Sequence, residues 1–281
     1  MLYIYGIKLG LKLLYRGKFK WATRYLIIPV NYWRCLEYRL ISRAGNFENC
    51  DKILDIGSPK LLSLYLAKKL GAEIYATDID DYFIREYGYL RKVEKIPAEK
   101  FHLNTEDGRQ LSFATATFNK VYSISAIEHI PDDGDTKCLR EIRRVLLPGG
   151  RCVITVPFSP ISQEEYSNPC FYWSRWSSTT PDGMVFYQRR YSEQDLFNRL
   201  VIPSEMKIKE LKYIGENILT HSKKEVWNVL PPITGPLHPL LSKLFYTTPV
   251  DSWRDLKKPL CALLVLEKKN HVITKRDIKS T

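Results

Sequence analysis

Short apolar runs alternate with segments of helical periodicity from residue 51 to residue 156. The apolar runs predict strands, which lie at Lys52–Ile56, Ile74–Thr77, Lys100–Leu103, Lys120–Ser125 and Arg151–Val156. The segments between them predict helices, of which the clearest are Lys60–Leu70, Asp80–Val93 and Thr136–Leu146. Strands separated by helices of this length favour a doubly wound, Rossmann-like α/β sheet that is mainly parallel.

The remaining sequence extends this sheet and interrupts it twice. A helix is predicted from Ser192 to about Leu200, and two late strands are predicted at Met206–Ile214 and Pro259–Glu267. Seven strands are therefore expected. Two irregular stretches rich in aromatic residues and proline, at about 157–190 and 216–257, read as insertions after the fifth strand and between the last two. We expect residues 50–281 to form one domain whose insertions cap a substrate.

Residues 1–49 form a separate N-terminal arm with an unusual charge. The chain carries 43 Lys and Arg against 31 Asp and Glu, a net charge of +12, yet the first 36 residues hold seven basic side chains and no acid. A helix is predicted from about Leu2 to Tyr15, and Lys8, Lys12 and Arg16 share one face of it. Two interpretations stay open: residues 1–24 touch an anionic membrane, or the helix packs as a lid over the domain.

Other sequence features narrow the class of protein. Six cysteines lack the CxxC or CxxH spacing of a zinc site, so we expect no metal and reduced thiols. Lysines interrupt the only candidate for a membrane span or for the apolar core of a signal peptide. We therefore expect a cytoplasmic protein, with peripheral membrane contact as the alternative. The oligomeric state cannot be predicted from these features.

Acidic and glycine residues stand where predicted parallel strands end. Asp55 and Gly57 close the first strand, Asp78 closes the second, and Asp107 with Gly108 follows the third. A glycine there permits a tight turn and a close approach of backbone N–H groups to an anionic ligand. An acid after the second strand can accept both hydroxyls of a ribose. The pattern predicts a site for a nucleoside-like cofactor.

Five segments, in order and spacing, resemble class I S-adenosylmethionine-dependent methyltransferases of the small-molecule type (methyltransferase type 11-like). They are ILDIG at 53–57, YATDID at 75–80, EDGRQLSF at 106–113, YSISAIEHIP at 122–131 and LREIRRVLLPGGRCVITVP at 139–157. The resemblance implies S-adenosyl-L-methionine as cofactor. It implies contacts from Asp55, Gly57 and Ser58 near the methionine end, Asp78 on the ribose, Asp107 and Gly108 near the adenine, and Ser125 under the sulfonium.

The glycine loop departs from the family pattern. The family usually continues glycine-x-glycine-x-glycine, whereas this chain reads Gly57-Ser58-Pro59-Lys60. Pro59 lacks an N–H group and adds bulk where the backbone approaches the ligand. The departure leaves open a chain that binds the cofactor weakly or that has lost catalysis.

His129, just after the fourth strand, is the candidate general base for an acceptor that keeps a proton. The alternative is that Glu128 and His129 only position the next loop. Aromatic residues of the first insertion are candidates for contacts with the substrate, namely Tyr172, Trp173, Trp176, Tyr187 and Tyr191. The alternative for each is a role in a small core of the insertion itself.

These features predict transfer of a methyl group, by in-line displacement, to a small hydrophobic or aromatic metabolite. An RNA methyltransferase is a less favoured alternative, because the basic arm is too apolar for a phosphate-binding tail and the rest of the chain is close to neutral. A non-catalytic relative that binds a membrane or a protein partner is the third reading. The atom that accepts the methyl group is not readable from the sequence.

Overall fold

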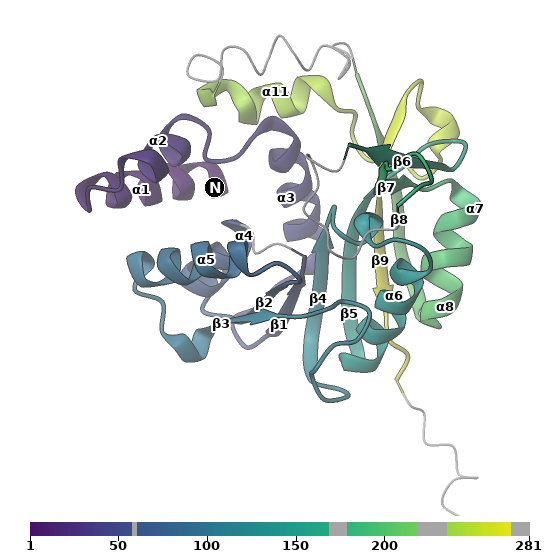
Figure 1. Cartoon of the computed structure of the whole chain (residues 1–281), viewed down its shortest axis with the longest axis horizontal. Coiled ribbons are helices and arrows are strands. Elements are labelled where there is room, and N and C mark those ends of the chain that lie inside the picture. The colour runs from purple at the N-terminus through teal and green to yellow at the C-terminus, as the bar shows by residue number, and fades with distance from the viewer. Residues whose placement is uncertain (58–60, 169–178, 218–234, 271–281) are drawn as a thin grey trace, which may run out of the picture.

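A seven-stranded sheet forms the centre of the molecule in the computed structural model, which describes residues 1–57, 61–168, 179–217 and 235–270 (Figure 1). The strand order is β3-β2-β1-β4-β5-β9-β8. The strands are β1 (Lys52–Ile56), β2 (Glu73–Asp78), β3 (Phe101–Thr105), β4 (Phe118–Ile124), β5 (Leu146–Pro157), β8 (Lys207–Gly215) and β9 (Pro259–Glu267). The first five strands are parallel, and β9 runs antiparallel to both β5 and β8. The predicted doubly wound, mainly parallel sheet is confirmed.

Helices cover both faces of this sheet and separate two apolar cores. Neighbouring residues of β1 show the division, because Ile53 faces one core and Leu54 faces the other. The first core contains α4 (Leu61–Tyr65), its continuation η1 (Leu66–Leu70) and α5 (Asp81–Glu94). The second contains α6 (Gly134–Val145) and η5 (Leu196–Val201), which the short helix α8 (Ile202–Ser204) continues. Burial on both faces explains the nearly continuous apolar character of these strands.

Local signals set the ends of the helices. Gly71 ends η1 in the left-handed conformation, with φ of 82°. The side chain of Asp80 accepts a hydrogen bond from the backbone N–H of Tyr82 and caps α5. Ser192 caps the short helix α7 (Glu193–Asp195) by accepting from the N–H of Asp195 at 3.2 Å. The helix boundaries predicted at these residues are therefore confirmed.

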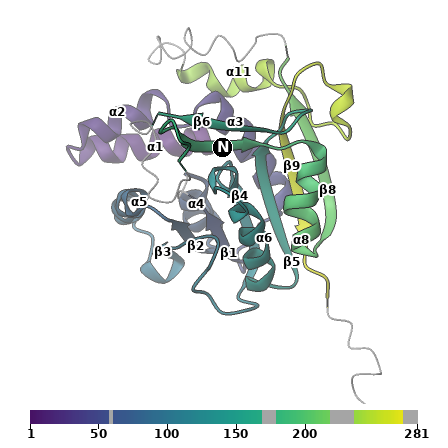
Figure 2. The same cartoon turned by 45° about the vertical axis from the view of Figure 1, so that its right-hand side comes forward.

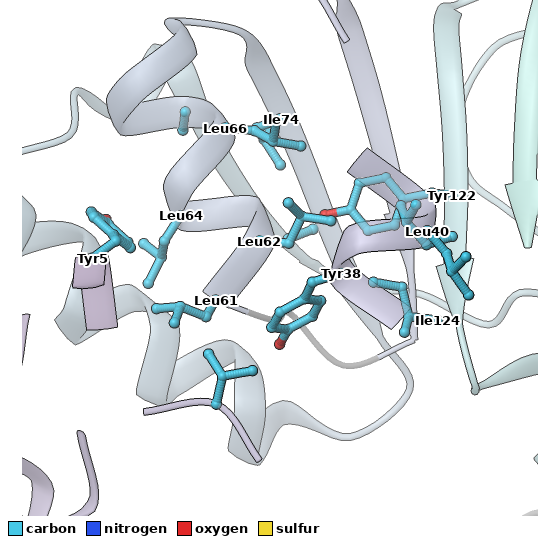
Figure 3. Close-up of a cluster of buried hydrophobic side chains, with 14 of the residues drawn as sticks. Tyr5, Tyr38, Leu40, Leu61, Leu62, Leu64, Leu66, Ile74, Tyr122 and Ile124 are labelled. Carbon is cyan, nitrogen blue, oxygen red and sulfur yellow. The ribbon is translucent and has the colours of Figure 1, made fainter. Parts of the chain in front are cut away.

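The N-terminal arm consists of three helices that pack on the first core. They are α1 (Leu2–Tyr15), α2 (Phe19–Ile27) and α3 (Tyr32–Gly45). Figure 3 shows Tyr5 of α1 and Tyr38 of α3 among the leucines of α4. Two ion pairs to α5, Lys12–Glu94 at 2.9 Å and Arg24–Glu86 at 3.1 Å, attach the arm further. The helix α3 crosses β4 and β5, so the arm extends to the middle of the sheet.

The first insertion contains a β-hairpin that the sequence did not predict. Its strands, β6 (Gln163–Ser167) and β7 (Val185–Arg190), pair antiparallel and lie near the upper end of the sheet in Figure 2. Ion pairs link the two strands, Arg189 to Glu164 at 2.8 Å and Arg190 to Glu165 at 2.5 Å. The irregular reading was wrong here because β6 is polar: cross-strand charge pairs supplement the buried Val185 and Phe186 of β7 in holding the hairpin together.

A buried carboxylate joins this hairpin to the domain. Asp135 of α6 has no exposed surface, and its oxygens accept hydrogen bonds from Arg189 at 3.0 Å and Arg199 at 2.8 Å. The hydroxyl of Tyr191 donates to the same carboxylate at 2.8 Å. The hairpin is thereby held at one place beside α6.

The second insertion contains a helix, α11 (His238–Phe245), where irregular structure was expected. It packs against α3, and its neighbour Tyr246 contacts Trp33 with ring centroids 5.2 Å apart. The hydroxyl of Tyr3 in α1 donates to the carbonyl of Gly235, just before α11. This helix therefore covers the junction of the arm and the sheet. Only part of the insertion is described, because residues 218–234 are not.

We predict that Asp135→Asn lowers the free energy of unfolding by about 3–5 kcal/mol, because it removes the fully buried charge that pairs with both Arg189 and Arg199. Urea denaturation followed by circular dichroism measures the change. Asp133→Asn is the matched control, since Asp133 pairs with Lys137 on the surface and should hardly alter stability. Equal effects of the two substitutions would contradict this role for Asp135.

Candidate functional site

The turns after β1 and β4 meet at the switch point of the sheet. These strands are neighbours in the sheet, but the chain continues from β1 to one side of the sheet and from β4 to the other. Open α/β sheets bind ligands at the carboxyl ends of the strands at such a switch point. Gly57, directly after β1, has φ of 84°, and a Cβ atom there would lie 2.3 Å from the Cβ of Ala126. Its N–H donates to the carbonyl of Thr77 at 3.0 Å. Only glycine fits this turn.

Asp55 supports the turn from inside the domain. Its side chain has no exposed surface and accepts a hydrogen bond from Ser63 of α4. Ser63 also bonds to the hydroxyl of Tyr122 in β4, at 2.8 Å. Burial, together with the charge of Asp55, raises the pKa of Tyr122 well above its usual value. Asp55 thus connects β1, β4 and α4, and its direct contact with a cofactor stays a prediction. Ser58, the next predicted contact, lies outside the described residues.

Asp78 is the last residue of β2, so it lies at the same carboxyl end of the sheet as Gly57, and it is partly exposed. One oxygen of its carboxylate accepts the N–H of Asp80 at 2.8 Å, which fixes the orientation of the side chain. Its backbone carbonyl accepts the N–H of Glu106 at 2.9 Å and brings the segment after β3 alongside. The next residue, Ile79, is apolar and 38% exposed. Ile79 was not among the predicted residues, although an apolar residue directly after a strand-end acid is a readable signal.

Asp107 and Gly108 follow β3, in the segment that the Glu106–Asp78 hydrogen bond brings alongside the end of β2. Burial opposes the ionisation of Asp107, but hydrogen bonds from Arg109 outweigh it and hold the pKa of the carboxyl below its usual value. The closest of these contacts joins Arg109 Nη2 to Asp107 Oδ2 at 2.7 Å. A Cβ atom on Gly108 would lie 3.2 Å from the sulfur of Cys138, so this backbone is closely packed. Arg109 was not among the predicted residues.

Ser125, at the end of β4, contacts the N-terminal arm. It has an uncommon positive φ of 42°, and its hydroxyl donates to Glu37 of α3. Glu37 has no exposed surface, and it also accepts from the hydroxyl of Thr155 in β5 at 3.1 Å. Arg34 completes the group, with its Nη1 atom 2.6 Å from Glu37. The structure therefore places an ion pair of α3 at the ends of β4 and β5.

Neither Arg34 nor Glu37 was predicted as a site residue. Burial would lower the pKa of Arg34, but Glu37 outweighs it, so the pKa is raised and the guanidinium stays charged. Arg34 also reaches the carbonyl of Ile124 at 3.4 Å. A weak signal was available, since Glu37 is the first acid after a long basic segment, but its partners are distant in sequence.

His129 lies in a short helical turn, η3 (Ile127–His129), and contacts the hairpin. Its Nδ1 atom is 2.6 Å from the carbonyl of Tyr187 in β7. Because a carbonyl only accepts, Nδ1 must carry the hydrogen, and Nε2 is then the basic nitrogen of a neutral ring. The rings of His129 and Tyr187 meet edge to face, 5.2 Å apart. The histidine is therefore held in one orientation beside β4.

The predicted aromatic contacts have different outcomes. Tyr187 is half-buried next to His129, and burial raises the pKa of its hydroxyl. Tyr191 is fully buried in the second core and donates to Asp135, so this residue does not line a ligand surface, contrary to the prediction. Tyr172, Trp173 and Trp176 lie outside the described residues.

Within the described ranges, no group of three or more His, Cys, Asp or Glu side chains could hold a metal ion.

Comparisons with known proteins agree with this geometry. Residues 54–154 match the model of a methyltransferase domain. No curated protein shows significant sequence similarity to the chain.

Several solved structures share the fold. A S-adenosylmethionine-dependent methyltransferase from Methanosarcina mazei is 17% identical, with a TM-score of 0.51 over 80% of this chain and 95% of its own. Geranyl diphosphate C-methyltransferase from Streptomyces coelicolor is 10% identical, with a TM-score of 0.53 over 84% and 77%. The cyclase SpnF is 15% identical, with a TM-score of 0.56 over 84% and 82%.

The chain therefore contains a methyltransferase domain, matched at residues 54–154, and it shares its fold with an S-adenosylmethionine-dependent methyltransferase of known structure. It is a transferase whose cofactor is S-adenosylmethionine, as the resemblance in the sequence implied. Among the similar structures, some are named as small-molecule methyltransferases, whereas SpnF carries the name of a cyclase.

The residues at the switch point fit this cofactor. Gly57 carries no side chain, so its backbone can come close to a ligand. Asp78 presents a partly exposed carboxylate that can accept the hydroxyls of a ribose. Asp107 stays ionised beside it and can accept a hydrogen bond from an adenine amino group.

We predict that Asp78→Asn weakens the binding of S-adenosylmethionine by roughly 10- to 150-fold, because hydrogen bonds to a charged acceptor contribute about 1.5–3 kcal/mol. Isothermal titration calorimetry measures the affinity. Asp81→Asn, three residues on in the exposed first turn of α5, is the control and should leave the affinity unchanged. An unchanged affinity for Asp78→Asn would refute the assignment of the ribose to this carboxylate.

We predict that Glu37→Gln lowers the free energy of unfolding by about 1–3 kcal/mol, since it removes the charge opposite Arg34 but keeps an acceptor for Ser125 and Thr155. Chemical denaturation measures stability. Glu48→Gln, in the exposed loop after α3, is the control. If stability were unchanged in Glu37→Gln, the ion pair would not hold α3 on the sheet.

Proposed function

We propose that the chain transfers a methyl group from S-adenosylmethionine to a small hydrophobic or aromatic metabolite. The acceptor would lie between the end of β4 and the hairpin β6–β7. One observation carries this proposal: two chemically different groups of residues meet at the switch point. Acids and glycines follow β1, β2 and β3, whereas Ser125, His129 and Tyr187 gather on the β4 side under the hairpin. The first group suits a nucleoside and the second suits a methyl acceptor.

The first group would hold the cofactor, through the Gly57 turn, Asp78 and Asp107. When bound, S-adenosylmethionine supplies a methyl group on a sulfonium. A nucleophile attacks the methyl carbon in line, and S-adenosylhomocysteine is the leaving group. The protein needs to align the acceptor and exclude water, so no fixed set of catalytic groups is required. The hairpin and the α3 ion pair would perform both tasks on the β4 side.

His129 is the residue we propose for proton removal. The hydrogen bond from its Nδ1 to Tyr187 leaves Nε2 to take a proton from an acceptor hydroxyl or ammonium group. Glu128 is nearly fully buried, with Oε1 4.0 Å from Nε2, and its charge favours the protonated ring that results. If the acceptor instead reacts at carbon, as a carbanion or through an allylic double bond, His129 would remove a proton from carbon.

A small acceptor agrees with the covering of this side. The hairpin is anchored by the buried Asp135 and packs over η3, which favours an enclosed ligand over a long polynucleotide. One structural neighbour is named for a small isoprenoid substrate, geranyl diphosphate. Because another is named a cyclase, transfer itself has to be measured.

The test uses S-adenosylmethionine labelled in its methyl group. Full-length protein is incubated with it and, separately, with an organic extract, an aqueous small-molecule extract and total RNA from the source cells. We expect label in a small-molecule extract, chiefly the organic one. Label confined to RNA would contradict the proposal, and so would absence of transfer from a protein that binds the cofactor.

The variant His129→Gln sharpens this test. We predict about 100- to 10,000-fold slower transfer, the usual contribution of a general base, with the affinity for S-adenosylmethionine unchanged. His102→Gln, far from this edge on β3, is the control. Undiminished transfer by His129→Gln would leave the histidine as a support for the hairpin only.

A further inference from the structure

One face of α1 is apolar yet points away from the protein. Ile4, Leu11 and Tyr15 are 60%, 54% and 94% exposed. Together with Lys8 they follow a spacing of four, three and four residues, which places them on one side of the helix. The opposite side carries the fully buried Leu9 and Leu13, which attach α1 to the first core. Because α1 is well packed on its opposite side, weak packing of the helix does not explain the exposed apolar face.

The basic residues of the arm divide into two sets. Lys12 and Arg24 are used internally, because they pair with Glu94 and Glu86 of α5. The other basic side chains of residues 1–27 are exposed and form no ion pair among the described residues, namely Lys8, Arg16, Lys18 and Lys20. No acid occurs in the first 36 residues. Positive charge and exposed apolar surface therefore coincide on the arm.

The turn between α1 and α2 adds a recess with aromatic walls. It has a volume of about 510 Å³ and is lined by residues 17–21 and by Tyr89 of α5. Trp21 and Tyr89 meet edge to face at 5.0 Å, and the ammonium of Lys18 lies 5.7 Å from the ring of Tyr89. Phe19, at the rim, is 67% exposed. Aromatic rings beside lysines are typical of protein surfaces at the boundary between lipid and water.

We propose that the outward face of α1 and the α1–α2 turn dock on the surface of an anionic lipid bilayer. The apolar side chains would enter the boundary between headgroups and acyl chains, while Lys8, Lys18 and Lys20 face the anionic headgroups. No helix among the described residues is long and apolar enough to cross a membrane, so the contact is peripheral. The proposal does not depend on methyl transfer.

Charge and hydrophobicity together favour a bilayer over the other occupants. RNA would use the lysines but would leave Ile4 and Leu11 in water. A second copy of the chain would cover the apolar side chains but would bring like charges together. An anionic bilayer satisfies both features at once.

Sedimentation with vesicles tests the proposal. The probe is phosphatidylcholine vesicles with and without 25% phosphatidylglycerol, mixed with the full-length protein. We expect binding to the anionic vesicles, weak binding to pure phosphatidylcholine, and release as salt rises. Lys18→Gln/Lys20→Gln should weaken binding roughly 30-fold, at about 1 kcal/mol per charge, and Leu11→Gln/Tyr15→Gln at least about tenfold. Circular dichroism confirms that the variants fold.

Matched controls come from the opposite side of the molecule. Ile202→Gln removes an equally exposed apolar residue of α8, and Lys207→Gln removes an exposed lysine of β8. Neither should alter binding to vesicles. The proposal is overturned if anionic vesicles do not bind the protein, or if the arm variants bind like the wild type. It is also overturned if the wild type forms a dimer that the Leu11→Gln/Tyr15→Gln variant no longer forms. RNA binding that is lost only in the lysine variant would overturn it as well.

Discussion

The contact between Gly57 and Ala126 is the constraint on which the ligand-binding edge depends. It brings the turn after β1 against the turn after β4, and these are the neighbouring strands from which the chain diverges. The acids after β2 and β3 then fall on one side of this contact, and Ser125 and His129 fall on the other. A side chain at position 57 would force the two turns apart and separate the groups proposed to bind cofactor and acceptor. The glycine thus matters through geometry as well as through its N–H group.

The buried carboxylate of Glu37 connects the arm to this edge. Burying a charge costs several kcal/mol, and here Arg34, Ser125 and Thr155 offset the cost by pairing or hydrogen bonding. Because Glu37 belongs to α3, the end of β4 is shaped by a helix that precedes the methyltransferase domain in the sequence. The arm therefore contributes to the end of β4, where we propose that the acceptor binds, and its outward face remains exposed.

Much of the fold could be predicted because the parallel sheet is buried on both faces. Its strands consequently read as apolar runs, and local signals such as Gly71 and Ser192 mark the helix ends. The positions of Asp78 and Asp107 at one edge followed from strand polarity alone. Their contacts did not, since the pairing of Asp107 with Arg109 depends on side-chain orientation.

The residues that were missed depend on contacts distant in sequence. Glu37 and Ser125 are 88 positions apart, and neither lies in a motif that names the other. The hairpin was missed because β6 is polar and ion pairs link it to β7. Tyr191 was misassigned because an aromatic residue in a loop serves a core or a ligand equally well by sequence. Only the buried Asp135 beside it decides between the two.

A crystal structure of the protein with bound S-adenosylhomocysteine would show whether the cofactor binds at the carboxyl ends of these strands. We expect density at the switch point between β1 and β4, with the ribose hydroxyls on Asp78 and the adenine beside Asp107 and Ile79. The sulfur should face Ser125, on the side of His129 and the hairpin. A ligand bound elsewhere, or no bound ligand at saturating concentration, would contradict the assignment of this edge as the cofactor site.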